Sequence, residues 1–168
     1  MSFIFNSVDR FVAGTVGQPG ERAFFIQVRK GARLTTVALE KTQVSALAER
    51  LETVLNDLRK TDFSLRITAL PTDDGPLEVP IESEFEVGTI SLSWDHSDST
   101  MSIELFELTS EDVEAKTSLR VQLSISMCDA FIKRTKALVG AGRPACPFCG
   151  LPVDPQSHLC PRANGYRR

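Results

Sequence analysis

The residues best suited to chemistry in this sequence are three cysteines and one histidine near its C-terminal end. Cys146 and Cys149 are separated by two residues, and His158 and Cys160 follow within the next eleven positions. Three thiolates and one imidazole form a standard structural zinc shell, and four protein ligands leave no coordination position open for a substrate. The sequence therefore predicts one structural Zn²⁺ ion bound by these four side chains.

The chain between the ligands has the form of a zinc knuckle. Pro147 presets a tight turn between the first two cysteines, and Gly150 permits the positive φ that such a turn needs just after them. A loop containing Pro152 and Pro155 then returns the chain toward the second ligand pair. We expect residues 141–168 to form this zinc-binding module, which ends in a basic tail.

Two other chemistries compete for the same cysteines. Cys146-Pro-Phe-Cys149 also resembles the redox motif of glutaredoxins, which follows a strand and precedes a helix. Here a predicted helix precedes the motif and a proline-rich loop follows it, so the context favours zinc. An iron site of the rubredoxin type would use four thiolates, and His158 again favours zinc.

The rest of the chain offers no recognisable catalytic residues. Cys128 falls on the apolar stripe of a predicted helix and is interpreted as a core residue. His96 lies beside Asp95 and Ser97 in a predicted turn, where adjacent side chains do not face one another in triad geometry. Gly14 and its neighbouring glycines precede no helix that could bind phosphate, so they are interpreted as hairpin glycines.

The secondary-structure elements predicted before the zinc motif follow the order strand, strand, strand, helix, and this order occurs twice. Alternating apolar residues predict strands over residues 11–16, 23–28 and 34–39 in the first half, and over 85–94, 101–108 and 119–123 in the second. Apolar residues at steps of three and four predict a helix over residues 44–58, with Thr42 as its N-cap. A second helix is predicted over residues 127–139, capped by Ser124 and ended by Gly140.

This order predicts an α+β fold built by tandem duplication of a β-β-β-α unit. The Gly14-Thr15 pair in the first unit matches Gly88-Thr89 in the second, and a turn-rich linker separates the halves, residues 1–70 and 77–140. We expect antiparallel sheets whose apolar faces are covered by the two helices. Residues 1–140 would form this body and residues 141–168 the appended zinc module.

Composition and charge limit the classes of protein that the chain can belong to. It is 42% hydrophobic and 24% charged, as soluble globular proteins are, and no apolar run approaches the ~18 residues of a membrane helix. Its first residues lack the features of a signal peptide, and cysteines clustered around a metal suit a reducing compartment. We therefore expect a cytoplasmic protein without a membrane segment.

Charge is strongly segregated along the chain. Residues 61–114 contain one basic and fourteen acidic side chains, whereas residues 140–168 contain four arginines and a single aspartate. An acidic middle segment repels phosphate backbones and attracts basic partners. The basic C-terminal segment supplies five candidate contacts for a partner or a phosphate, Arg143, Arg162, Tyr166, Arg167 and Arg168.

Several runs of the sequence resemble a conserved actinobacterial family of unknown function. They are residues 9–17, residues 19–22, the Leu39-Glu-Lys helix start, and the C-terminal Cys-Pro-x-Cys-Gly and His-x-Cys-Pro-Arg motifs. The resemblance covers nearly the whole chain. It implies the architecture described above and brings no activity with it.

Three functional hypotheses follow. The first is a non-enzymatic zinc-binding protein, a protein-interaction or regulatory module whose protein partner is unidentified. The second is a single-stranded DNA- or RNA-binding protein, because duplicated sheet-and-helix bodies resemble the Pur and Whirly proteins and Phe148 or Tyr166 could stack on a base. The third is an enzyme whose site is not recognisable from the sequence.

Overall fold

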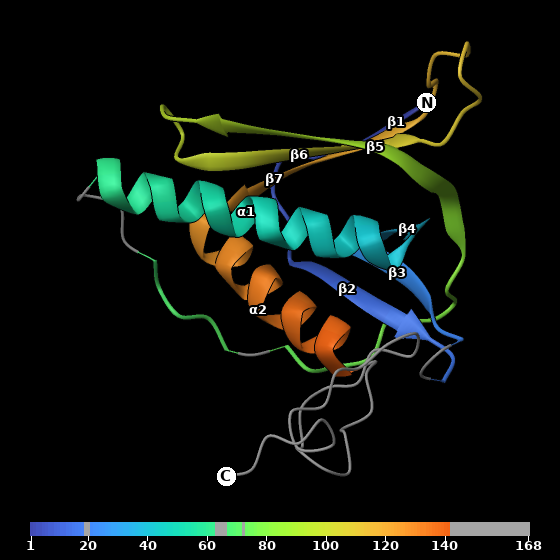
Figure 1. Cartoon of the computed structure of the whole chain (residues 1–168), viewed down its shortest axis with the longest axis horizontal. Helices are drawn as coiled ribbons and strands as arrows, with labels where there is room; N and C mark the ends of the chain where they lie inside the picture. Colours follow the sequence, from blue (N-terminus) through green and yellow to red (C-terminus); the bar gives the residue numbers. More distant parts are fainter. Residues whose placement is uncertain (19–20, 63–66, 72, 142–168) are drawn as a thin grey trace, which may run out of the picture.

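The seven strands of this protein form one mixed sheet, and two helices pack against it (Figure 1). The computed structural model describes residues 1–18, 21–62, 67–71 and 73–141. The elements are β1 (Ser2–Phe5), β2 (Arg10–Val16), β3 (Ala23–Lys30), β4 (Arg33–Leu39), α1 (Lys41–Thr61), β5 (Ser83–Asp95), β6 (Thr100–Glu107), β7 (Ser118–Ser124) and α2 (Ile125–Ala141). Across the sheet the strand order is β1-β7-β6-β5-β4-β3-β2. The α+β class is therefore confirmed.

The sheet consists of two antiparallel meanders joined by a parallel pair. β2-β3-β4 and β5-β6-β7 are each antiparallel, whereas β4 and β5 run parallel, with Thr36 opposite Ser83 and Ala38 opposite Glu86. The prediction of antiparallel sheets is corrected here. A parallel pair requires a long crossover connection, and α1 with the segment after it supplies one. Both halves have the same strand order, but the duplication itself stays a prediction.

The first strand was absent from the prediction. β1 pairs in parallel with β7, so Phe5 lies opposite Val121 and is only 2% exposed. The Arg33 guanidinium lies 4.3 Å from the centroid of the Phe5 ring and donates a hydrogen bond to the carbonyl of Ile4. Four residues are too few for alternation to indicate a strand, so only tertiary pairing reveals this one.

The helix boundaries differ slightly from those predicted. α1 begins after Glu40, because the Gln43 side chain reaches back to accept a hydrogen bond from the Glu40 N–H at 2.7 Å, so the Thr42 cap was wrong. Ser124 does cap α2, since its hydroxyl accepts the Met127 N–H at 3.2 Å. Gly140 lies inside α2 and lacks the positive φ of a residue that follows a helix.

The core lies between the helices and the face of the sheet that curves around them. Alternate side chains of two central strands are fully buried there: Met101, Ile103 and Leu105 on β6, and Leu119, Val121 and Leu123 on β7. From α2, Phe131 packs on Phe11 of β2 with ring centroids 4.8 Å apart. From α1, Val44, Leu47, Leu51, Leu55 and Leu58 add a continuous buried stripe.

The opposite face of β2-β3-β4 is covered by residues 73–82, which we call the strap. Leu77 of the strap is 7% exposed and packs so closely on Gly14 that an added Cβ there would lie 2.4 Å from its Cδ2. Gln27, 1% exposed, donates to the Glu78 carbonyl and accepts the Glu78 N–H, both at 2.8 Å. The strap therefore covers the second face of the sheet at β2 and β3 and leads directly into β5.

Candidate functional site

The predicted zinc ligands lie outside the described residues, as do the basic tail residues. Cys146, Cys149, His158 and Cys160, together with Arg143, Arg162, Tyr166, Arg167 and Arg168, all belong to residues 142–168. Within the described part of the chain, no group of three or more histidine, cysteine or acidic side chains is placed to hold a metal ion. The zinc site and the domain boundary at residue 140 stay predictions.

Cys128 is confirmed as a core residue. Its side chain is fully buried on α2, and this burial, with a smaller contribution from Asp129, raises the pKa of the thiol to about 12. A thiol in this environment stays protonated, whereas metal binding and nucleophilic attack require the thiolate.

His96 is confirmed as a turn residue. It is exposed, and its Nδ1 accepts a hydrogen bond from the Trp94 indole at 3.2 Å. The neighbouring Asp95 carboxylate instead accepts the backbone N–H groups of Ser97 and Asp98. These three positions therefore form a turn and have no triad geometry.

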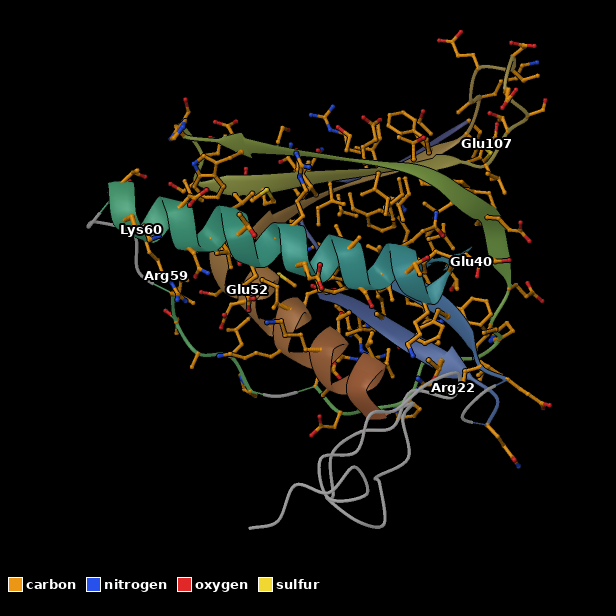
Figure 2. All side chains as sticks on the ribbon, viewed as in Figure 1. Arg22, Glu40, Glu52, Arg59, Lys60 and Glu107 are labelled. Carbon is orange, nitrogen blue, oxygen red and sulfur yellow. The ribbon has the colours of Figure 1, made fainter. Side chains whose placement is uncertain are left out.

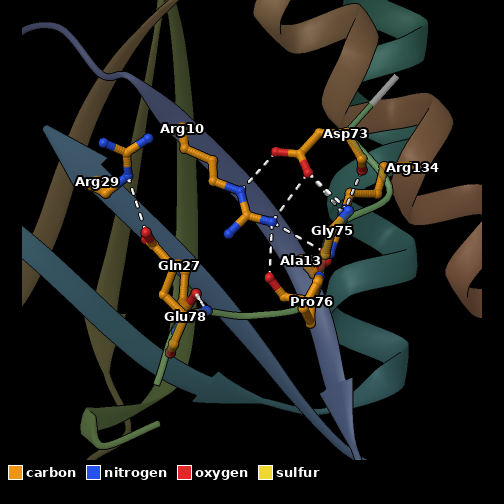
Figure 3. Close-up of polar contacts among 9 residues, drawn as sticks. All are labelled: Arg10, Ala13, Gln27, Arg29, Asp73, Gly75, Pro76, Glu78 and Arg134. Carbon is orange, nitrogen blue, oxygen red and sulfur yellow. Dashed lines mark hydrogen bonds and ion pairs between the residues drawn. The ribbon is translucent and has the colours of Figure 1, made fainter. Parts of the chain in front are cut away.

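The most highly organised polar site in the described residues is a pair of arginines at the edge of the sheet (Figure 3). Arg10 lies on the edge strand β2 and Arg134 on α2, and each side chain is 13% exposed. Arg10 grips the Asp73 carboxylate with two bonds, from Nε at 2.7 Å and from Nη2 at 3.1 Å. Arg134 Nη1 lies 3.5 Å from the same carboxylate. Two cations from distant elements thus converge on one anion.

Backbone carbonyls complete the coordination of this arginine pair. Arg134 Nε donates to the Ala13 carbonyl of β2 at 2.8 Å, and its Nη2 donates to the Gly75 carbonyl at 2.9 Å. Its Nη1 donates to the Asp73 carbonyl, and Arg10 Nη2 donates to the carbonyls of Gly75 and Pro76. The arginine pair therefore fastens the start of the strap to the sheet edge.

The electrostatics of this site follow from burial and proximity. Hydrogen bonds from Arg10 are the main cause that lowers the pKa of Asp73, and the Gly75 N–H and the charge of Arg134 act in the same direction. Burial lowers the pKa of Arg134, and the nearby charge of Arg10 adds to that shift. Without an anion between them, the two guanidinium groups would repel one another in a poorly solvated site.

A cavity of about 320 Å³ adjoins the arginine pair. Its accessible apolar wall includes Leu70, Pro71 and Met127. Its charged wall combines three basic side chains with four carboxylates: Arg10, Lys133, Arg134, Asp9, Asp73, Asp74 and Asp129. Ligand sites in proteins commonly combine an apolar lining with a few convergent polar groups, and this cavity has both.

A second cavity, of about 550 Å³, lies where β4 leads into α1. Figure 2 shows Glu40 at the start of α1 and Arg22 near the end of α2, and both line it. Two of its donors bond backbone carbonyls, Gln43 Nε2 to Val87 at 2.8 Å and Arg22 Nη1 to Leu138 at 3.3 Å. The cavity beside the arginine pair differs in that two guanidinium groups converge there on one exposed carboxylate, so we take it as the candidate site.

Basic side chains of the described body are largely committed to internal contacts. Those in ion pairs are Arg10, Arg29, Lys30, Arg59, Lys133, Arg134 and Lys136. Arg22 and Arg33 stack on phenylalanine rings and donate to backbone carbonyls. Exposed carboxylates lie along β5 and on the loop that follows β6. Figure 2 labels Glu107, the last residue of β6, where this loop begins. This distribution disfavours phosphate-backbone binding by the body.

Comparison with known proteins places the chain in a family. The model of a family described as "Protein of unknown function (DUF3090)" matches residues 3–160. The chain belongs to this family. No curated protein and no solved structure matches this chain. Among the residues described, no helix is long and apolar enough to cross a membrane.

The arginine pair was missed at the level of sequence. Arg10 lies in the run of residues 9–17 that carries the family resemblance, but nothing in that run points to Arg134, which is far away in the chain. The one available signal was the Asp73-Asp-Gly75 turn, where the Asp73 carboxylate also accepts the Gly75 N–H at 3.1 Å. A turn of this kind indicates a local bend, but not which distant cations lie beside it.

Proposed function

We propose that this protein is a non-enzymatic zinc-binding protein whose C-terminal module, residues 141–168, binds a protein partner. The observation that carries the proposal is the Cys₃His set, Cys146, Cys149, His158 and Cys160. The family match extends to residue 160, so all four ligands lie inside the region shared with the family. One structural zinc ion would order the module without requiring a core of its own.

The described body supports a role in binding more than one in catalysis. Cys128 is buried as a thiol, and His96 lies in an exposed turn away from any acid–base partner of triad type. Exposed carboxylates lie along β5 and on the loop after β6. An acidic body joined to an arginine-rich module suits a protein partner that presents both kinds of charge.

Single-stranded nucleic acid is the second candidate partner. Four arginines in residues 140–168, with Tyr166 among them, favour it, since such binders combine cations with aromatic stacking. Nucleic-acid binding by the body is disfavoured, because many of its basic side chains already form ion pairs with carboxylates of the same chain. The two partners differ in salt dependence, because phosphate contacts weaken steeply as salt is raised.

We also infer that the body is a tandem duplication. Apart from β1, which has no counterpart in the second half, the two halves share the order of three antiparallel strands followed by a helix. Gly14 lies on β2 and Gly88 on β5, the first strands of the two meanders. Superposition of the halves should align these strands and then α1 with α2. Misaligned helices would make the sequence echo a coincidence.

Metal analysis of the purified protein tests the proposed function. We expect about one zinc per chain, released on acidification because thiolates must deprotonate to bind the ion. Cys149→Ser should lose the metal. Cys128→Ser is the matched control and should retain it, because the Cys128 thiol is buried in the core.

Two results would overturn the zinc assignment. One is protein that contains iron or no metal, and the other is equal loss of zinc from both cysteine variants. If zinc is present, binding of the full chain to single-stranded DNA at low and high salt separates the two candidate partners.

A further inference from the structure

The arginine pair favours an anion, and the protein supplies one from its own strap. Two guanidinium groups with 13% exposed side chains lie close enough for the charge of Arg10 to act on Arg134. Without the Asp73 carboxylate they would keep only backbone carbonyls as partners, and their mutual repulsion would be uncompensated. An anion at the position of the Asp73 carboxylate therefore stabilises the site.

Asp73 holds this position in the manner of a bound ligand. Its carboxylate accepts the bidentate pair of hydrogen bonds that arginine typically donates to a carboxylate or a phosphate. The Asp73 side chain is nevertheless 41% exposed. It projects from the turn at the solvent-facing start of the strap. The anion is therefore the most accessible member of a site whose cations are largely buried.

The strap does not depend on Asp73 alone for its attachment. Beyond this residue, the arginines bond the carbonyls of Gly75 and Pro76. Leu77 then packs on Gly14, and Glu78 exchanges two backbone hydrogen bonds with Gln27. Withdrawal of the Asp73 carboxylate would therefore require movement of one turn, with the remainder of the strap in place.

We propose that Arg10 and Arg134 form an anion-binding site that Asp73 occupies until a small phosphate- or carboxylate-bearing ligand displaces it. The ligand anion takes the place of the Asp73 carboxylate between the two guanidinium groups. Its apolar body enters the adjoining cavity of about 320 Å³, against Leu70, Pro71 and Met127. All residues named in this site belong to the described body.

Calorimetric titration of the full chain in phosphate-free buffer tests this site. The probes are inorganic phosphate, phenyl phosphate and benzoate. Asp73→Asn removes the internal competitor, so phenyl phosphate should bind at least about tenfold more tightly than to the wild type, as expected when an occluded site becomes fully available. Benzoate carries the same ring on a carboxylate, so the tighter of the two aromatic probes identifies the preferred anion.

Two control variants make the result specific. Asp57→Asn removes the same charge from an exposed position on α1 that does not line the cavity, and should bind the probes as the wild type does. Arg10→Gln added to Asp73→Asn should abolish binding. Equal affinity of the Asp73→Asn and Asp57→Asn variants for all probes would overturn the proposal, as would binding that survives loss of Arg10.

A measurement on the wild type covers the case in which Asp73→Asn does not fold. Phenyl phosphate at high concentration should displace Asp73 and shift the Arg10 Nε–H resonance in a saturable way. Inorganic phosphate should need a higher concentration, because it leaves the apolar wall unfilled. The absence of a saturable shift with every probe would overturn the proposal.

Discussion

At the scale of single residues, the carboxylate of Asp73 links local charge to the stability of the fold. Hydrogen bonds from Arg10 lower its pKa in the folded protein, whereas in the unfolded chain it titrates near ~3.9. A group whose folded pKa is lowered contributes stability that is fully present above its unfolded pKa. That stability is lost as the pH falls from the unfolded pKa through the folded one.

Asp73→Asn should therefore destabilise the protein at neutral pH and have a smaller effect in acid. We expect a loss of about 1 kcal/mol at pH 7, a modest value because the side chain is 41% exposed and solvent screens the ion pair. The difference from the wild type should shrink below about pH 4. Urea unfolding at several pH values in phosphate-free buffer measures it. A difference that stays constant with pH would contradict the assigned cause.

At the scale of elements, the strap packs closely on β2 at Gly14. A Cβ on Gly14 would lie 2.4, 2.5 and 2.9 Å from the Cδ2, Cγ and Cδ1 atoms of Leu77. Cβ atoms are essentially never this close to another non-bonded heavy atom, so a side chain at position 14 must displace the Leu77 side chain or the strap that carries it. Gly14 is thus required by close approach, although its φ is not positive.

Gly14→Ala should cost about 1–3 kcal/mol of unfolding free energy as an overpacked contact. In a Leu77→Ala background the same change should cost less, because the clashing atoms are absent, giving a coupling above ~0.5 kcal/mol. Gly31→Ala is the matched control. Gly31 has open space around it and a φ of +59°, so its cost should come from backbone strain and show no coupling to Leu77. Equal coupling for both glycines would contradict the packing argument.

The elements also show how far sequence patterns reach. Both meanders, α1, α2 and the core position of Cys128 were predictable, because periodicity reports which face of an element is buried. The parallel junction of β4 with β5 and the short β1 were not, since pairing partners leave no mark on local periodicity. Gln27 illustrates the limit, because a glutamine in a strand suggests exposure, yet this one is 1% exposed and bonds a residue 51 positions away.

The candidate site was predictable only in part for the same reason. The four proposed zinc ligands lie within fifteen residues, so their spacing alone carries the chemistry. The arginine pair is assembled by tertiary structure from β2, α2 and the strap. Its members become neighbours only because α2 packs on β2 and the strap passes the free edge of that strand.

At the scale of the whole molecule, the first and last parts of the body are bound into one core. β1 pairs with β7 at one edge of the sheet, and α2 packs on β2 at the other. The hydrophobic core cluster runs from Phe5 to Ile132, with Leu138 and Val139 packed against it. Arg22 bonds the Leu138 carbonyl near the end of α2, so contacts among the described residues connect both ends of the body to the same core.

The body should therefore fold without the zinc module. A chain cut after Gly142 is expected to unfold cooperatively, with a melting temperature within about 4 °C of the full-length protein, which corresponds to a loss of roughly 1 kcal/mol or less. It should contain no zinc, and it should not capture a partner that the full chain binds. Calorimetry of both chains, with metal analysis, measures these outcomes. If the shortened chain aggregates or melts much earlier, residues 143–168 serve as a structural cap, and the binding surface must lie on the body, where the arginine pair and its cavity are the first place to search.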